Sequence, residues 1–246
     1  MLGCFTPHTP RLRLKDIADQ LAIPMGSAFR TLRTLETLGF VVQDPVTKQY
    51  RLGLKALDLS LACLAGMEFP DVALPFLEEL ASQTRLSANM AVLDGTEIVF
   101  VARASVVRLL RSNLSVGSRL PGHCTAMGKV LLAHLEPTEA RARLAGGALK
   151  AFTPRTMVDV DTLLDALKDI RAVGFAVCRE ELELHLTAVA VPVVDATGRA
   201  VAAINVAMYT GPGDDESSVL AVLPKLILTG AAVSSALGYR PGGASR

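Results

Sequence analysis

The stretch that decides the fold runs from Leu14 to Leu52 and reads LKDIADQLAIPMGSAFRTLRTLETLGFVVQDPVTKQYRL. Residues 15–21 place their apolar side chains on one helical face. A second helical spacing follows from Pro24 to Leu38, with the proline suited to the first turn and Gly39 suited to a left-handed C-cap. Two short strands around the loop 44–48 complete the order helix, tight turn, helix, β-hairpin. This order predicts a winged helix-turn-helix.

Charge is distributed unevenly along the 246 residues, although the net charge is only +1. The segment up to Gly66 carries eight Lys and Arg against five Asp and Glu, net +3, and the remainder carries seventeen against nineteen, net −2. A basic module ahead of a slightly acidic one indicates two functions in one chain. Half of the residues are apolar and 20% are charged, which excludes an extended disordered chain.

The larger part of the chain mixes helices and strands, which predicts an α+β domain. The hairpin signal Asp94-Gly95 joins two of its strands, and a loop is expected through Pro121. We expect three parts: a DNA-binding domain at 1–53, a linker helix at 54–68 and a second domain at 69–246. The strands expected in that domain cover residues 87–93, 97–104, 109–113, 176–179, 187–194 and 200–208, and the helices cover 71–84, 126–134, 138–144, 161–173 and 219–239.

Two apolar helices each allow two interpretations. The leucines between Leu54 and Met67 repeat along one side, as in an ordinary core helix, but the pattern also suits a linker helix that pairs subunits. The stretch Val219–Tyr239 is long enough for a membrane span. Because it contains Pro224, Lys225 and many Ser and Ala residues, we expect a buried helix and no membrane partner.

A helix-turn-helix lays the start of its second helix in the DNA major groove. Arginine binds guanine through two hydrogen bonds, whereas serine and threonine contact bases or phosphates. Basic residues in the wing reach the phosphate backbone. The alternative is a protein-interaction module, which the local net charge of +3 disfavours. We expect DNA contacts from Met25, Gly26, Ser27, Phe29, Arg30, Thr31, Arg33, Thr34, Lys48 and Arg51.

Residues 117–133 read GSRLPGHCTAMGKVLLA and lead from a loop into a helix. Five residues separate Gly122 from Gly128, and Lys129 is followed by Val130, so the stretch lacks the phosphate-loop pattern G-x4-G-K-[ST]. Two interpretations remain. The free N–H groups of the helix start bind an anion such as a carboxylate, or the stretch is a plain helix start.

The cysteines favour a reduced compartment, because Cys4, Cys63, Cys124 and Cys178 form no C-x-x-C pair and no signal-like segment starts the sequence. We therefore expect a cytoplasmic protein. His123 lies beside Cys124, but adjacent side chains usually point apart, so the pair is a poor nucleophile and base.

A zinc site at Cys178, Glu181 and His185 is equally weak, because so mixed a trio lacks a second ligand pair. We expect no catalytic residue, no metal and no cofactor.

Three stretches together resemble the IclR family of bacterial transcriptional regulators. They are the winged helix at 14–52, the loop and helix at 117–133, and residues 180–193, EELELHLTAVAVPV. Residues 202–206 and 223–224 extend the resemblance over almost the whole chain. Within the family, the segments around 93–103 and 118–129 most resemble the branch that controls aromatic-acid catabolism, the protocatechuate and 4-hydroxybenzoate regulators.

The resemblance implies a winged-helix DNA-binding domain, a linker helix and a GAF-like α+β effector-binding domain. It also implies homodimers or dimers of dimers on palindromic DNA operators, and a small organic acid as effector. The pocket would be a mainly apolar wall with an amide and a thiol as polar groups, which suits an apolar or aromatic acid. The family's effector positions fall here on Leu109, Ala126, Met127, Cys178, Leu186, Ala188, Asn205 and Ala207.

The family also has a helix ahead of Leu14, where this chain reads MLGCFTP. We expect either a chain that starts too late or partial cover of the remaining helices by Leu2, Phe5 and Leu12. Weak DNA binding follows from this expectation. Equal operator affinity of a version extended upstream would contradict it.

The sequence therefore predicts a ligand-responsive transcription factor. Its effector would shift the equilibrium between dimer arrangements that do or do not hold two recognition helices about 34–36 Å apart. One alternative is a ligand-binding domain or an enzyme that uses Cys124 or Cys178 covalently, with an incidental winged helix. Another is a degenerate regulator that has no DNA affinity and acts through protein contacts.

Overall fold

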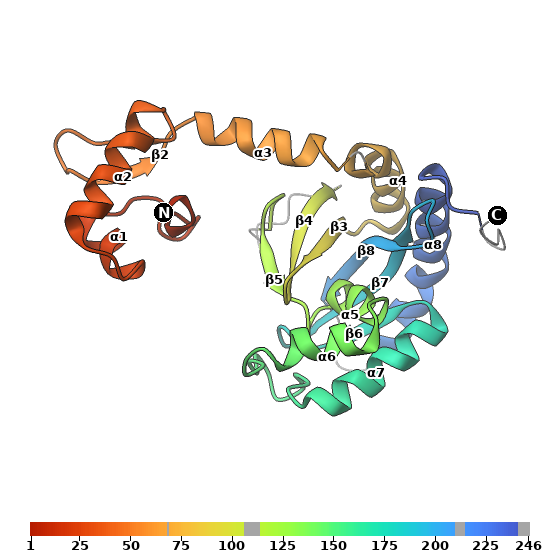
Figure 1. Ribbon diagram of the computed structural model, residues 1–246. Helices are drawn as coiled ribbons and strands as arrows, with labels where there is room; N and C mark the ends of the chain where they lie inside the picture. The colour runs from red at the N-terminus through yellow and green to blue at the C-terminus, as the bar shows by residue number, and fades with distance from the viewer. Residues whose placement is uncertain (68, 106–113, 210–214, 241–246) are drawn as a thin grey trace. The chain divides into compact units, whose positions relative to one another are not determined.

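The computed structural model describes residues 1–67, 69–105, 114–209 and 215–240. The chain forms two compact units, Met1–Met67 and Glu68–Arg246 (Figure 1). The finer boundaries expected at 53/54 and 68/69 stay predictions. The strand expected at 109–113 lies outside the described residues.

The first unit has the expected order of a winged helix-turn-helix. Helix α1 (Leu14–Gln20) and helix α2 (Met25–Thr37) precede an antiparallel pair of strands, β1 (Val41–Gln43) and β2 (Tyr50–Leu52). Pro24 is the N-cap of α2 and not part of its first turn, because its backbone is extended at ψ 139°.

The end of α2 follows the sequence pattern closely. Gly39 has φ +81°, and the Phe40 N–H donates to the Leu35 carbonyl at 2.9 Å. This left-handed cap confirms the role expected of the glycine.

The N-terminal residues complete the core of this unit. Phe5 and Leu12 are buried in one cluster with Ile17 and Leu32, and Leu2 packs against it. A 3₁₀ turn at residues 2–4 precedes Phe5, and Leu12 and Tyr50 exchange backbone hydrogen bonds of 3.0 and 2.7 Å. The expected cover by Leu2, Phe5 and Leu12 is therefore present.

Helix α3 (Lys55–Ala65) is described along its whole length, and none of its residues is buried. Leu54, Leu57 and Leu61 are 80%, 59% and 66% exposed. The interpretation as an ordinary core helix is therefore wrong, because a core helix buries its apolar side.

The second unit is built on a six-stranded antiparallel sheet with the order β5-β4-β3-β8-β7-β6. This architecture confirms the α+β prediction. Its strands are β3 (Ala88–Asp94), β4 (Glu97–Ala104), β5 (Arg119–Pro121), β6 (Ala176–Arg179), β7 (Leu186–Val194) and β8 (Ala200–Tyr209), and its helices are α4 (Phe69–Thr84), α5 (Ala126–Ala133), α6 (Pro137–Ala145), α7 (Val160–Val173) and α8 (Asp215–Ala236).

Helices cover both faces of this sheet (Figure 1). On one face Ala190 of β7 packs into a core with Met127 and Val130 of α5, and α6 and α7 continue that layer. On the other face Val191 touches Gly230 of α8 so closely that a Cβ on the glycine would lie 2.6 Å from the valine side chain. Adjacent residues of a strand thus serve two separate cores.

One strand was not expected from the sequence. Residues 119–121 fall in the predicted loop but pair with residues 97–99 as the edge strand β5. Arg119 holds this edge through ion pairs with Asp94 (2.5 Å) and Glu97 (2.8 Å). Three residues are too few for a recognisable alternation, so only the partner strand defines this element.

By length and composition, Glu216–Ala236 of α8 is long and apolar enough to cross a membrane, and α3 and α4 pass the same test when they are taken together. In α8 the side chains of Val222, Leu226 and Val233 are buried in the protein, where the helix packs on β7, β8 and α4. Only 33% of the apolar window of α8 is buried in the protein, and Leu220 and Leu228 are 65% and 70% exposed. One side of the helix therefore packs in the core, and the helix is not buried all round as expected.

Candidate DNA-reading helix and effector cavity

Helix α2 presents a polar face opposite its buried side. Ala28 and Leu32 are completely buried, and at 3.6 residues per turn Gly26, Arg30 and Arg33 lie on the opposite side. Of the ten residues expected to contact DNA, nine are exposed and Ser27 is half-buried. The exposed face is the part of the helix that a DNA groove can receive.

Hydrogen bonds along α2 decide which of these groups is available. The Thr31 and Thr34 hydroxyls donate to carbonyls four residues earlier, at 3.0 and 3.1 Å, so their oxygens remain as acceptors. Arg33 forms a 2.9 Å ion pair with Glu36, whereas Arg30 donates one longer bond of 3.3 Å to Ser27. Arg30 therefore loses a weaker interaction than Arg33 does when it binds a guanine or a phosphate.

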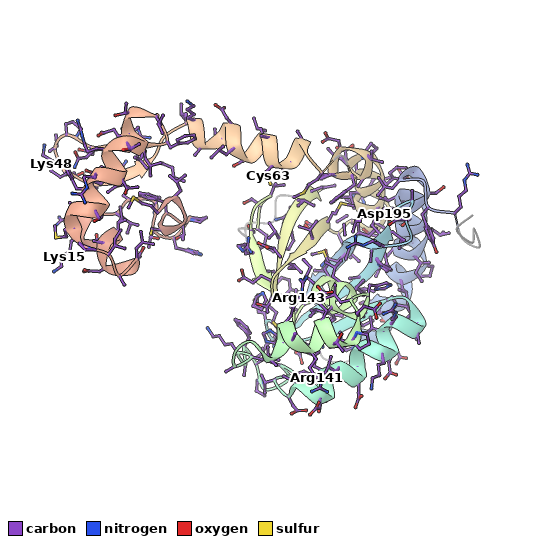
Figure 2. The ribbon with its side chains drawn as sticks, viewed as in Figure 1. Lys15, Lys48, Cys63, Arg141, Arg143 and Asp195 are labelled. Carbon is purple, nitrogen blue, oxygen red and sulfur yellow. The ribbon has the colours of Figure 1, made fainter. Side chains whose placement is uncertain are left out.

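The wing presents a second basic group. Asp44 accepts from the backbone N–H groups of Thr47 and Val46, both at 2.9 Å, and these bonds lower the pKa of its carboxyl group. Lys48 follows the turn that they close, with φ +58°, and its side chain projects from the unit (Figure 2). Arg51 lies on β2 and is exposed.

A cavity lies in the second unit between the start of α5 and the sheet. Of the expected effector positions, seven line it and Leu109 lies outside the described residues. The seven come from four elements: Ala126 and Met127 from α5, Cys178 from β6, Leu186 and Ala188 from β7, and Asn205 and Ala207 from β8.

The start of α5 is built by two glycines and a threonine. A Cβ on Gly128 would lie 2.2 Å from the Gly122 carbonyl oxygen, so the glycine pair allows the loop to pack directly on the helix. Thr125 caps the helix by accepting from the Gly128 N–H at 3.3 Å, and its hydroxyl donates to Pro121 at 2.9 Å. The glycine spacing therefore serves close packing, which agrees with the rejection of a phosphate loop.

Several lining residues were not expected to bind the effector. Three of them, in β5 and the loop just before α5, belong to the loop-helix stretch 117–133, whereas the others come from β3, β4 and distant loops that no local pattern connects with α5. They are Asn89, Ile98, Phe100, Leu114, Leu120, Cys124, Thr125, Glu181 and Leu182.

A buried ion pair lies beside the cavity. Lys129 of α5 donates to Oε1 of Glu181, and their side chains are 3% and 7% exposed. The Thr156 hydroxyl donates to the Glu181 carbonyl at 2.6 Å and holds this loop in place. Because the lysine neutralises the carboxylate, this end of the cavity carries no net charge.

The cavity cysteines are poor nucleophiles. Burial raises the pKa of the Cys124 thiol to about 12, with a smaller contribution from Glu181, and burial also raises the pKa of Cys178. His123 shares a 2.9 Å hydrogen bond with the Lys150 carbonyl. Both thiols stay protonated at neutral pH, and the thiol is much less reactive than the thiolate.

No group of three or more His, Cys, Asp or Glu suited to a metal occurs within the described ranges.

A winged helix followed by an α+β unit with a mainly apolar cavity defines a ligand-responsive transcription regulator. Residues 1–45 match the IclR helix-turn-helix domain, and residues 61–235 match the C-terminal domain of bacterial transcriptional regulator IclR. The chain therefore belongs to the IclR family of bacterial transcriptional regulators.

Individual relatives agree with this assignment. The chain is 38% identical to the Pca regulon regulatory protein of Pseudomonas putida over 212 residues, which cover 86% of this chain and 72% of that protein. Among solved structures, a transcriptional regulator from Rhodococcus sp. RHA1 has 33% identity and a TM-score of 0.81, covering 96% of this chain and 94% of that one.

A third comparison concerns the second unit. The inducer-binding domain of the transcription factor PobR from Acinetobacter, a double mutant in complex with 3-hydroxybenzoic acid, has 36% identity and a TM-score of 0.61, covering 67% of this chain and 97% of that one. The expected family and its aromatic-acid branch are confirmed by these relatives.

Proposed function

We propose that this protein is a cytoplasmic regulator that binds a palindromic operator as a homodimer or a dimer of dimers and responds to a small aromatic acid. The observation that carries the proposal is that seven expected effector positions line one cavity at the start of α5. The relatives are transcription regulators, which supports a regulatory role.

The chemistry of the cavity supports an aromatic acid as effector. Ile98, Phe100 and Leu120 supply an apolar wall for a ring, and the backbone N–H groups at Ala126 and Met127 open a buried helix whose N-terminus favours a carboxylate. The similar inducer-binding domain from Acinetobacter holds 3-hydroxybenzoic acid.

The exposed leucines of α3 support pairing of two copies. Leu54, Leu57 and Leu61 recur at helical spacing on one side and are all more than half exposed. A second copy of α3 packed on this side would bury them, as in other helix pairs. Two recognition helices, one from each copy, would then contact the two halves of a palindrome.

The DNA side of the proposal is tested by fluorescence anisotropy with duplexes from the chain's own promoter, at two salt concentrations. Phosphate contacts lower the affinity with a log–log slope of about −0.9 for each phosphate neutralised. Addition of 3- or 4-hydroxybenzoate should change the affinity, because an effector acts through its different affinity for the two dimer arrangements. A DNA affinity that changes neither with the salt concentration nor on addition of the acid would contradict the proposal.

The alternative of an enzyme is tested by replacing Cys124 and Cys178 together with Ser. We expect the acid to bind without turnover before and after the exchange, because burial keeps both thiols protonated. Conversion of the acid by the unchanged protein, lost in the double variant, would establish the enzyme instead.

A further inference from the structure

One buried polar atom of the cavity lacks a partner. Asn89 of β3 is 5% exposed and lines the cavity, and its Nδ2 donates to Oδ1 of Asn205 at 2.9 Å. Its own Oδ1 is buried and accepts no hydrogen bond from the residues that the structure describes. Buried polar groups are almost always hydrogen-bonded, so an unpaired buried oxygen on a residue that lines the cavity indicates a missing donor.

The neighbouring strand sets the orientation of this amide. Asn89 lies directly opposite Asn205 in the antiparallel pair β3–β8, so the two side chains lie next to each other on the face toward α5. A rotation of the Asn89 amide alone would bring two carbonyl oxygens together. With Asn205 oriented as in the structure, the hydrogen bond directs Nδ2 of Asn89 to its neighbour and leaves Oδ1 as an acceptor.

The rest of the lining restricts which donor fits. Ile98 and Phe100 provide an apolar wall, which suits an aromatic ring. A cationic donor finds no compensating charge here, because the Glu181 carboxylate is already paired with Lys129. A neutral O–H group on an aromatic ring satisfies both conditions, since a phenol is a strong donor without charge.

We propose that Asn89 is a specificity-determining residue of the effector site, and that its Oδ1 accepts the hydroxyl of a hydroxybenzoate. This inference rests on the proposed function, because it names the group that selects among aromatic acids. A site built to bind a hydroxyl discriminates against analogues without it, since the buried acceptor is otherwise left unpaired.

The test is calorimetric binding of benzoate, 3- and 4-hydroxybenzoate and the matching fluorobenzoates to the full chain. Fluorine is close to a hydroxyl in size but cannot donate. We expect the better hydroxybenzoate to bind at least about tenfold more tightly than benzoate and its fluoro analogue, a typical effect of one buried hydrogen bond.

Two variants assign this preference to Asn89. In Asn89→Leu, which is similar in size, the ratio of hydroxybenzoate to benzoate affinity should fall to about one. Asn89→Ala provides a second variant if the first fails to fold. Ile98→Val alters the same cavity without touching a polar group and should preserve the ratio.

The outcomes separate this inference from the proposed function. Equal affinities of the unchanged protein for all the acids, or a preference that survives in both Asn89 variants, would overturn the role of Asn89 while leaving an aromatic-acid site. Failure of the unchanged protein to bind any of the acids would overturn the aromatic effector itself and this inference with it.

Discussion

Replacement of Lys129 by Met tests the energetics of the buried ion pair. The substitution keeps a long side chain on α5 but leaves the Glu181 carboxylate, whose side chain is 7% exposed, without its cation. Breaking a buried pair by removing one partner costs about 3–5 kcal/mol. For a unit of this size each kcal/mol corresponds to about 2–4 °C in Tm, so the transition of the second unit should fall by roughly 6–20 °C.

The assay is thermal unfolding followed by circular dichroism, with a matched control at the surface. Lys168 and Asp165 form an ion pair of 2.8 Å in which both side chains are more than 70% exposed, so Lys168→Met should change stability by less than about 1 kcal/mol. The double variant Lys129→Met, Glu181→Leu should recover most of the loss, because it buries no unpaired charge.

Two results would refute this reasoning. A Tm of Lys129→Met close to that of Lys168→Met would mean that water still reaches the Glu181 carboxylate. A double variant as unstable as Lys129→Met would mean that lost packing, and not the unpaired charge, causes the destabilisation.

Three further predictions concern DNA binding and thiol chemistry. Arg30→Ala should weaken operator binding by about 1–3 kcal/mol in an anisotropy titration if it contacts a base, whereas Arg141→Ala in the second unit should leave it unchanged. Lys48→Ala should reduce the steepness of the log–log salt dependence by about one without changing sequence preference. Burial raises the pKa of Cys124 to about 12, so iodoacetamide at pH 8 should alkylate the exposed Cys63 and leave Cys124 unmodified. Mass spectrometry measures both modifications. Cys124 should become reactive only as the pH rises toward its pKa.

The elements of both units were largely predictable because their signals are local. The helical spacing from Ala28 to Leu38 and the glycine that follows it produce α2 and its left-handed cap within about fifteen residues. The Asp94-Gly95 turn likewise lies between β3 and β4 as expected. In such segments each residue interacts mainly with neighbours a few positions away. The element can therefore be predicted from the segment alone, without the rest of the chain.

The candidate site was predictable only through resemblance to a family, and its polar partners not at all. Nothing in the composition connects Asn89 with Asn205, which lie 116 positions apart, or Lys129 with Glu181, which lie 52 apart. Their contacts depend on which strands become neighbours and on how α5 packs against them.

The amino-acid order alone thus determined where the helices, the turns and the longer strands form, because backbone preference and apolar periodicity are properties of short segments. The tertiary structure decided that the leucines of α3 stay exposed, that residues 119–121 form an edge strand, and that a residue lining the cavity has a buried amide oxygen without a partner among the described residues. Burial and strand pairing depend on contacts between residues that are far apart in the sequence. These contacts form only when the chain has folded.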